Sequence, residues 1–199
     1  MTLLAGRTVL AVDTETTGMS PAEGHRLVEV ARVAVVDGAL GEEWSSLVQP
    51  GRPIPPDAAR VHGIHDAMVA GAPPAAEVAR TLREACDDLP LVFHNAPFDL
   101  PFLVHLFREA GAPPLLNPIL DTLGLARGLF GSTASNSLGP LSARLGLPAE
   151  TAHRALGDAR TTARLFVLLA GRWEGERGVR SLAELAAVSQ DVMRTTGRR

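Results

Sequence analysis

Two carboxylates stand at the end of an apolar run near the start of the chain. The stretch Val9-Leu10-Ala11-Val12 predicts a buried strand; if it continues through Glu15, its period of two puts Asp13 and Glu15 on one face and Thr14 on the other. At ~4 Å and an effective dielectric of ~20, two such charges repel by about 4 kcal/mol unless a cation lies between them. Oxygen ligands of this kind suit Mg²⁺ or Mn²⁺. The alternative is a solvated strand end, because an Asp-x-Glu pair alone is a weak signal.

Three more candidate residues follow where predicted strands meet predicted helices. Asp99 lies in the first turn of a helix that comes directly after a short strand, and Asp158 opens a later helix, with His153 in the loop before it. Taken singly, each acid could only stabilise a helix dipole, and a lone loop histidine is usually solvated. Taken together, four acids and one histidine at element ends around a sheet indicate a two-metal site.

The segments that would position these residues alternate between strand and helix. We expect strands at 9–15, 27–36, 42–48, 89–93 and 119–120, and helices at 57–61, 66–70, 74–87, 97–109, 122–127, 138–145, 158–169 and 181–192. Asp37-Gly38 favours a type I′ hairpin turn, and Asp121 is predicted to cap the helix after it. We expect a loop from Gly128 to Ser137 and fraying from Arg194 to Arg199. The pattern indicates one α/β domain, an antiparallel meander followed by two strands that alternate with helices.

The composition of the chain argues against several classes of function. The chain has 199 residues, 46% of them apolar and 21% charged, which is typical of one soluble domain. It lacks a signal-peptide pattern and an apolar run of the ~20 residues that a membrane span needs. The single cysteine, Cys86, suits a reducing compartment, so we expect a cytoplasmic protein.

All 19 basic residues are Arg, which excludes P-loop and Schiff-base chemistry and argues against haloacid-dehalogenase-type phosphatases. A net charge of −3 does not favour general, tight nucleic-acid binding.

Three motifs in one order and spacing carry a family resemblance. They are Asp13-x-Glu15-Thr16-Thr17-Gly18, His94-Asn95-x-x-Phe98-Asp99 and His153-x4-Asp158. Together they resemble the DEDDh 3′→5′ exonucleases, most closely the proofreading epsilon subunits of bacterial DNA polymerase III. The resemblance spans Val9 to about Leu169 and includes Val61-His62-Gly63-Ile64 and the segment 121–127. A histidine in the third motif separates the chain from relatives that use tyrosine there.

The resemblance implies a fold and a domain layout. The fold is α/β and ribonuclease-H-like, with a mixed five-stranded sheet, an antiparallel meander plus two parallel strands, flanked by helices. We expect the exonuclease domain to cover residues 1–175. Residues 176–199 would form a C-terminal helix packed on the same domain, with a frayed tail.

The resemblance also assigns catalytic roles to these positions. Asp13, Glu15, Asp99 and Asp158 would ligate two divalent metal ions, Mg²⁺ or Mn²⁺, and so clamp the terminal phosphodiester. His153 would take a proton from the attacking water as general base, a role that its near-neutral intrinsic pKa suits.

The terminal nucleotide has its own candidate residues. The resemblance implies that it is held by Thr16, Gly18, Met19, Val61, His62 and Phe98. Met19 and Phe98 could instead pack in the core, and His62 with His65 could form a metal pair, although such a pair rarely binds metal without further ligands. Asn95 could orient ligands or cap the following helix.

Three functions remain open on these grounds. The leading one is a metal-dependent 3′→5′ exonuclease that releases nucleoside 5′-monophosphates from single-stranded or frayed DNA 3′ ends, in proofreading or end trimming. A replicative DNA polymerase is then a candidate partner. The alternative is an exoribonuclease of short RNA or RNA 3′ ends, because no residue unmistakably recognises the 2′-hydroxyl. A binding or scaffold domain without catalysis would be expected to lack one of the acids or the histidine, and all five are present.

Overall fold

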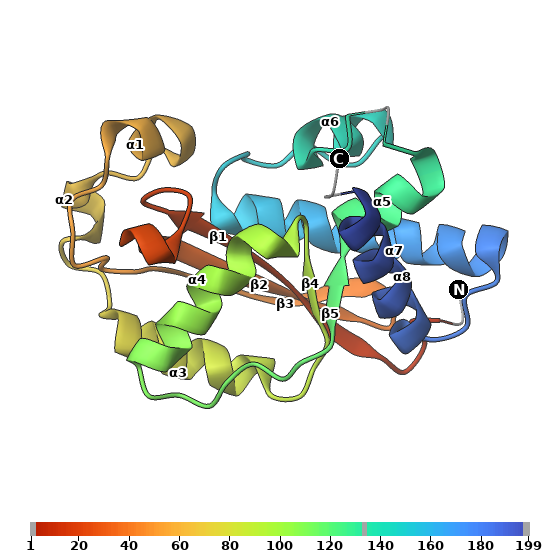
Figure 1. Cartoon of the computed structure of the whole chain (residues 1–199), viewed down its shortest axis with the longest axis horizontal. Helices are drawn as coiled ribbons and strands as arrows, with labels where there is room; N and C mark the ends of the chain where they lie inside the picture. The colour runs from red at the N-terminus through yellow and green to blue at the C-terminus, as the bar shows by residue number, and fades with distance from the viewer. Residues whose placement is uncertain (1–2, 133–134, 197–199) are drawn as a thin grey trace.

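A mixed five-stranded sheet forms the centre of the computed structural model, which describes residues 3–132 and 135–196 (Figure 1). The strand order is β3-β2-β1-β4-β5, with β1 antiparallel to β2, β2 antiparallel to β3, and both β1/β4 and β4/β5 parallel. The strands are β1 (Thr8–Thr16), β2 (Leu27–Val36), β3 (Ala39–Leu47), β4 (Leu91–Phe93) and β5 (Ile119–Asp121). The predicted meander and the two parallel strands are confirmed.

The turn between β2 and β3 follows the expected chemistry. Asp37 and Gly38 both have positive φ, 53° and 80°, as a type I′ turn requires. The turn sets Val36 opposite Ala39, so β3 begins at Ala39 and not at the predicted Glu42. In the sheet, β1 lies between β2 and β4.

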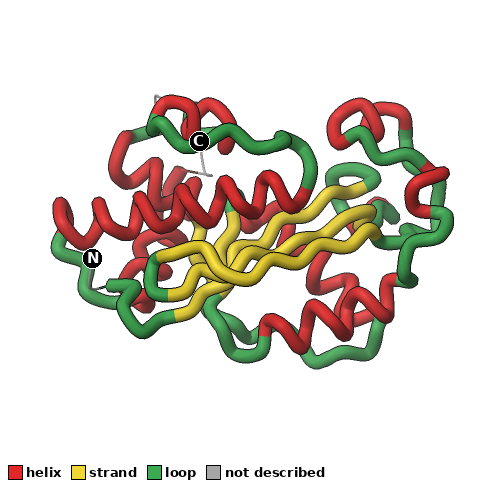
Figure 2. The backbone as a smooth tube through the Cα atoms, turned by 180° about the vertical axis from the view of Figure 1, so that it is seen from behind, coloured by secondary structure: helices red, strands yellow, loops and turns green. Residues whose placement is uncertain are grey.

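Helices cover both faces of the sheet. Their bounds are η1 (Pro21–Glu23), α1 (Pro56–His62), α2 (Asp66–Val69), α3 (Ala75–Cys86), α4 (Ala96–Glu109), α5 (Thr122–Phe130), α6 (Leu138–Arg144), α7 (Ala155–Arg177) and α8 (Leu182–Thr196). Figure 2 shows α7 lying across one face, where α5 and α8 also pack, while α3 and α4 cover the other face. Successive side chains of β1 point to opposite faces of the sheet. Val9 and Ala11 pack under α7, whereas Leu10 and Val12 pack under α3 and α4.

Three of the predicted helices continue three or more residues beyond their predicted C-terminal ends, and α7 also begins at Ala155, three residues before its predicted start. The helix α5 continues to Phe130, through residues that were expected to begin a loop, because Phe130 packs between the guanidinium groups of Arg144 and Arg172. The helix α7 runs eight residues past the predicted end, since buried Trp173 donates its indole N–H to the Leu125 carbonyl. The helix α8 includes residues 194–196, which were expected to fray; residues 197–199 lie outside the described part.

The segment α8 packs against α5 and β5. The Ser189 hydroxyl accepts a hydrogen bond from the Asp121 backbone N–H, and the Gln190 amide donates to the Ile119 carbonyl. These bonds tie the C-terminal helix to the edge of the sheet. Among the described helices, none combines the length and the apolar character needed to cross a membrane.

Candidate active site

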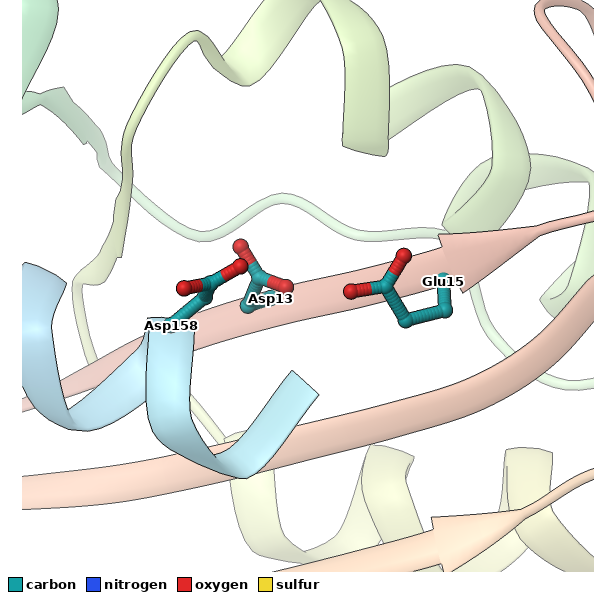
Figure 3. Close-up of side chains that lie close together, drawn as sticks. All are labelled: Asp13, Glu15 and Asp158. Carbon is teal, nitrogen blue, oxygen red and sulfur yellow. The ribbon is translucent and has the colours of Figure 1, made fainter. Parts of the chain in front are cut away.

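Three carboxylates meet at the carboxyl end of β1. Asp13 and Glu15 project from β1 toward α7, and Asp158 projects back from the first turn of that helix (Figure 3). Each of the three offers one ligand oxygen, and these oxygens lie within 4.8 Å of one another. The predicted strand continuation through Glu15 is therefore confirmed, and its period of two is what puts both β1 acids on the α7 face.

Burial and mutual repulsion oppose the ionisation of these carboxylates. Burial raises the pKa of Asp13 well above its usual value, and the charges of Asp99, Asp158 and Glu15 raise it further. Burial, with Asp158 and Glu29, raises the pKa of Glu15 to about 8. These carboxylates resist ionisation when no cation is bound. A hard divalent cation prefers oxygen ligands and stabilises their ionised form, so the residues present fit such an ion.

Asp99 reaches the site from the opposite layer. It lies in the first turn of α4, and its Oδ1 accepts a hydrogen bond of 2.6 Å from the Thr14 hydroxyl. Burial raises its pKa to about 7, against the lowering effect of the Thr14 bonds. Asp99 is not one of the acids whose oxygens gather within 4.8 Å, yet its charge has the largest electrostatic effect on the pKa of Asp13. The sequence placed Thr14 on this second face but did not indicate its contact with Asp99.

A second buried acid, Asp121, holds the start of α4. Its carboxylate accepts hydrogen bonds from the backbone N–H groups of Asn95 and Ala96, and also from those of Leu123 and Gly124 at the start of α5. The predicted cap of α5 is confirmed. Asn95 occupies the N-cap position of α4 with φ 75° but makes no side-chain cap bond, so the cap proposed for it comes from Asp121.

His153 stands beside the acids in an exposed turn. Its backbone has a left-handed φ of 56°, and its N–H donates to Asp158 Oδ2 at 3.0 Å. His153 and Asp158 both line a cavity of about 440 Å³ between α6 and the start of α7. The turn thus places an exposed histidine next to Asp158, a carboxylate of the candidate metal site.

A family comparison agrees with this geometry. The model of the exonuclease family RNase_T matches residues 10–166, a stretch that contains the four acids and His153. The chain belongs to this exonuclease family. Exonucleases of this family generally use divalent metal ions, and the acids at the end of β1 form a group that can hold one.

Individual relatives of this exonuclease domain support the same assignment. A DNA polymerase III subunit epsilon-like protein of Rhodobacter capsulatus is 45% identical over 166 residues, and a PolC-type DNA polymerase III of Streptococcus suis is 34% identical over 166 residues. These alignments cover 81% and 83% of the chain but only 23% and 11% of the two relatives. The predicted resemblance to epsilon-type exonucleases is confirmed.

Solved structures agree on the fold. Exonuclease X in complex with 5′ overhanging duplex DNA has a TM-score of 0.70 and 30% identity, over 91% of this chain and 99% of that chain. E. coli Exonuclease I in complex with a dT13 oligonucleotide has a TM-score of 0.75 at 20% identity, over 86% of this chain and 43% of that one, which shows a shared fold. The predicted ribonuclease-H-like fold is confirmed.

Two of the residues predicted to hold the terminal nucleotide are exposed apolar side chains. Met19, in the loop after β1, is 74% exposed, and Val61, in the last turn of α1, is 56% exposed. Core packing of Met19, which the sequence left open, is excluded by this exposure. The Thr16 hydroxyl donates to the Gly18 carbonyl at 2.7 Å and so shapes the loop that carries Met19.

His62 and Phe98 are more enclosed. His62 is buried, and its Nδ1 accepts the Ile64 backbone N–H at 3.0 Å, so the ring is held by its own turn. Burial is the main cause that lowers the pKa of His62, which favours the neutral imidazole. Phe98 is half-buried, and its ring lies 5.7 Å from the ring of Phe102. One edge of Phe98 therefore belongs to the α4 core.

Proposed function

We propose that this protein is a 3′→5′ exonuclease that removes nucleoside 5′-monophosphates from single-stranded or frayed DNA 3′ ends, in proofreading or end trimming. The observation that carries the proposal is the gathering of Asp13, Glu15 and Asp158 at the end of β1, with His153 in the adjoining turn. Support for DNA as substrate comes from the relatives, whose names and bound oligonucleotides concern DNA.

Asp13, Glu15, Asp99 and Asp158 would hold two divalent ions, Mg²⁺ or Mn²⁺. When bound, such ions lower the pKa of a water and stabilise the leaving 3′-oxygen. The chain itself keeps the four carboxylates in place from three elements, because β1 supplies two of them, α7 supplies Asp158 and α4 supplies Asp99. The Thr14 hydroxyl fixes the orientation of Asp99.

His153 would accept the proton of the attacking water. Its imidazole is exposed at the cavity it shares with Asp158, so a proton taken there passes readily to bulk water. Since Asp158 Oδ2 accepts the His153 backbone N–H, the backbone of His153 stays next to this carboxylate. A general base placed in this way typically contributes about 10²–10⁴-fold to the rate.

The terminal nucleotide would contact the loop after β1, the end of α1 and the start of α4. We propose that the Thr16–Gly18 turn and His62 bound the sugar, while Met19, Val61 and Phe98 offer apolar surface to the base. Contacts of this kind grip any base without reading its hydrogen-bonding edge, which suits an enzyme that must remove every nucleotide.

The decisive experiment incubates the purified protein with matched 5′-labelled DNA and RNA strands and Mn²⁺. We expect stepwise shortening of DNA from the 3′ end and no shortening by the Asp13→Ala or Asp158→Ala variants at unchanged circular dichroism. Turnover retained by these variants contradicts the ligand assignment. Preferred shortening of RNA favours the exoribonuclease alternative, and no turnover on either strand favours a binding domain.

Metal binding gives a second test. Titration with Mn²⁺ in the presence of a nucleoside monophosphate should reach a stoichiometry near two metal ions per chain. A titration without divalent binding excludes the mechanism even if nucleic acid is bound.

We further propose the setting in which this activity operates. Residues 1–175 would form the exonuclease domain, with residues 176–199 packed on it, and the protein would work in the cytoplasm, where its lone thiol at Cys86 stays reduced. A replicative DNA polymerase is the proposed partner, supported by the polymerase III names of the relatives. Co-purification of the protein with polymerase subunits would test this.

A further inference from the structure

Another buried acid lies next to the proposed metal site without belonging to it. Glu29 of β2 is 4% exposed and stands directly opposite Glu15 in the antiparallel register. Residues that oppose each other in this way project to the same face of a sheet. A buried carboxylate requires a counter-charge and hydrogen-bond donors. Its partners therefore indicate what it does.

Those partners come from the start of α7. Arg154 donates from Nε to Glu29 Oε2 at 3.0 Å and from Nη2 to Oε1 at 2.7 Å, a two-pronged ion pair. The Ala155 backbone N–H donates to Oε2 at 2.9 Å. Arg154 occupies the N-cap position of α7 but makes no side-chain cap bond of its own. A side chain from the sheet therefore satisfies the first N–H of this helix.

The same few residues determine where His153 lies. The backbone N–H of His153 donates to the Asp158 carboxylate. His153 has a left-handed backbone and directly precedes Arg154 in the chain. On the other side of the turn, the Thr151 carbonyl lies so close to Gly157 that a Cβ added there would be 2.1 Å from the carbonyl oxygen. The turn is thus anchored to β2 at one end and pressed against the first turn of α7 at the other.

We propose that Glu29 and Arg154 form a positioning pair, which locks the turn before α7 onto the sheet so that His153 and Asp158 stay directed at the Asp13–Glu15 carboxylates. Neither residue touches the reacting atoms in this proposal, which rests on the proposed nuclease function. Because the two side chains bond to each other, the lock leaves no unpaired side chain of this pair next to the metal site.

The chain offers a matched control on the same helix. Arg160 and Glu43 form a similar two-pronged pair between α7 and β3, with Arg160 Nε to Glu43 Oε1 at 2.9 Å and Nη2 to Oε2 at 2.6 Å. This pair also joins α7 to the sheet, but it lies beyond the turn that carries His153. Arg160 Nη1 also lies 3.5 Å from Glu150 Oε2, just before that turn, but Arg164 pairs with the same Glu150 and keeps it paired when Arg160 is replaced. A general effect of losing an ion pair on α7 would appear equally in both places.

The kinetic test compares Arg154→Ala with Arg160→Ala on a labelled DNA strand. Loss of a partner that orients a metal ligand typically costs about 10–100-fold, so we expect kcat of Arg154→Ala to fall by that factor with KM unchanged. Arg160→Ala should retain the wild-type kcat. Arg154 is 40% exposed, so an unchanged kcat with a raised KM would show instead that it binds a substrate phosphate and would overturn the proposal. Equal losses in the two variants would overturn it as well.

Two further variants guard against misfolding. The double variant Glu29→Gln/Arg154→Met removes both charges, keeps similar volume and leaves an acceptor for the Ala155 N–H, and we expect it to fold and still lose kcat. Arg154→Lys keeps the charge but loses the two-pronged geometry, so we expect an intermediate kcat. A double variant with the wild-type kcat would overturn the proposal.

Hydrogen exchange supplies a readout that does not need activity. Amides of residues 151–157 should exchange faster in Arg154→Ala than in the wild type, while Arg160→Ala leaves this segment unchanged. Unchanged exchange in Arg154→Ala would overturn the positioning role. If the wild-type protein hydrolyses neither DNA nor RNA, the proposed function fails, and the exchange data still decide whether the pair orders the turn.

Discussion

The raised pKa of Glu15 makes the stability of the metal-free protein depend on pH in a predictable direction. Below pH 4.5 this carboxyl is protonated in both the folded and the unfolded chain, so its contribution is fully retained. As pH rises toward the folded-state pKa of about 8, the unfolded chain ionises first and the folded state loses stability. We therefore predict that Glu15→Gln, which cannot ionise, stabilises the metal-free protein at high pH and changes little at low pH.

The magnitude follows from the size of the shift. Moving the pKa of a buried carboxyl from 4.5 to about 8 makes its ionised form cost on the order of 5 kcal/mol in the folded state. For a chain of this length each kcal/mol corresponds to about 2–4 °C in Tm. In chelator at about pH 8.5, Glu15→Gln should therefore melt roughly 10–20 °C above the wild type.

Thermal unfolding followed by circular dichroism at low and high pH, with and without Mg²⁺, measures this effect. Added Mg²⁺ should raise the wild-type Tm at high pH through binding to the folded state, and should raise the Glu15→Gln Tm less. The control is Glu77→Gln, a change at an exposed position on α3. If the Tm difference between Glu15→Gln and wild type is the same at both pH values, the raised pKa assigned to Glu15 is refuted.

Three further changes have defined outcomes. His153→Ala should lower kcat by roughly 10²–10⁴-fold and leave Mn²⁺ affinity nearly intact, and a smaller loss in a single-turnover assay points to another base. Asp121→Ala removes the acceptor that caps two helices and should cost about 1–4 kcal/mol in urea unfolding, with wild-type stability as the contradicting result. Gly157→Ala should cut kcat about 10²-fold by displacing the Thr151 carbonyl. Its control, Gly175→Ala, has free space around it and should gain about 0.5–1 kcal/mol in stability; an unaffected Gly157→Ala enzyme would count against the close fit of the turn.

Local signals in the sequence were sufficient for most of the sheet. The β-branched run from Leu27 to Val36 matches β2 at both ends, and the Asp37-Gly38 turn has the positive φ values that its residues favour. Helix ends were harder because distant residues decide them. Phe130 remains helical through guanidinium groups from α6 and α7, and Trp173 prolongs α7 through a carbonyl of α5. Neither contact is visible in the sequence around those ends.

The candidate site shows the same division. Strand period and motif spacing pointed to Asp13, Glu15 and Asp158, and the structure brings these three together. The residues that hold them in place were missed, since the bond from Thr14 to Asp99 joins residues 85 positions apart and that from Arg154 to Glu29 spans 125. A lone acid inside an apolar strand was the one available signal for Glu29, and only a tertiary contact explains it.

One consequence of the layered fold concerns the nascent protein. Asp158 arrives from the helices on one side of the sheet and Asp99 from those on the other, and the two approach each other only at the end of β1. A chain that has formed its meander but has not yet docked either layer carries two neighbouring acids and no complete cage. The proposed hydrolysis therefore requires both helical layers to be docked on the sheet, because neither layer alone brings all four carboxylates together.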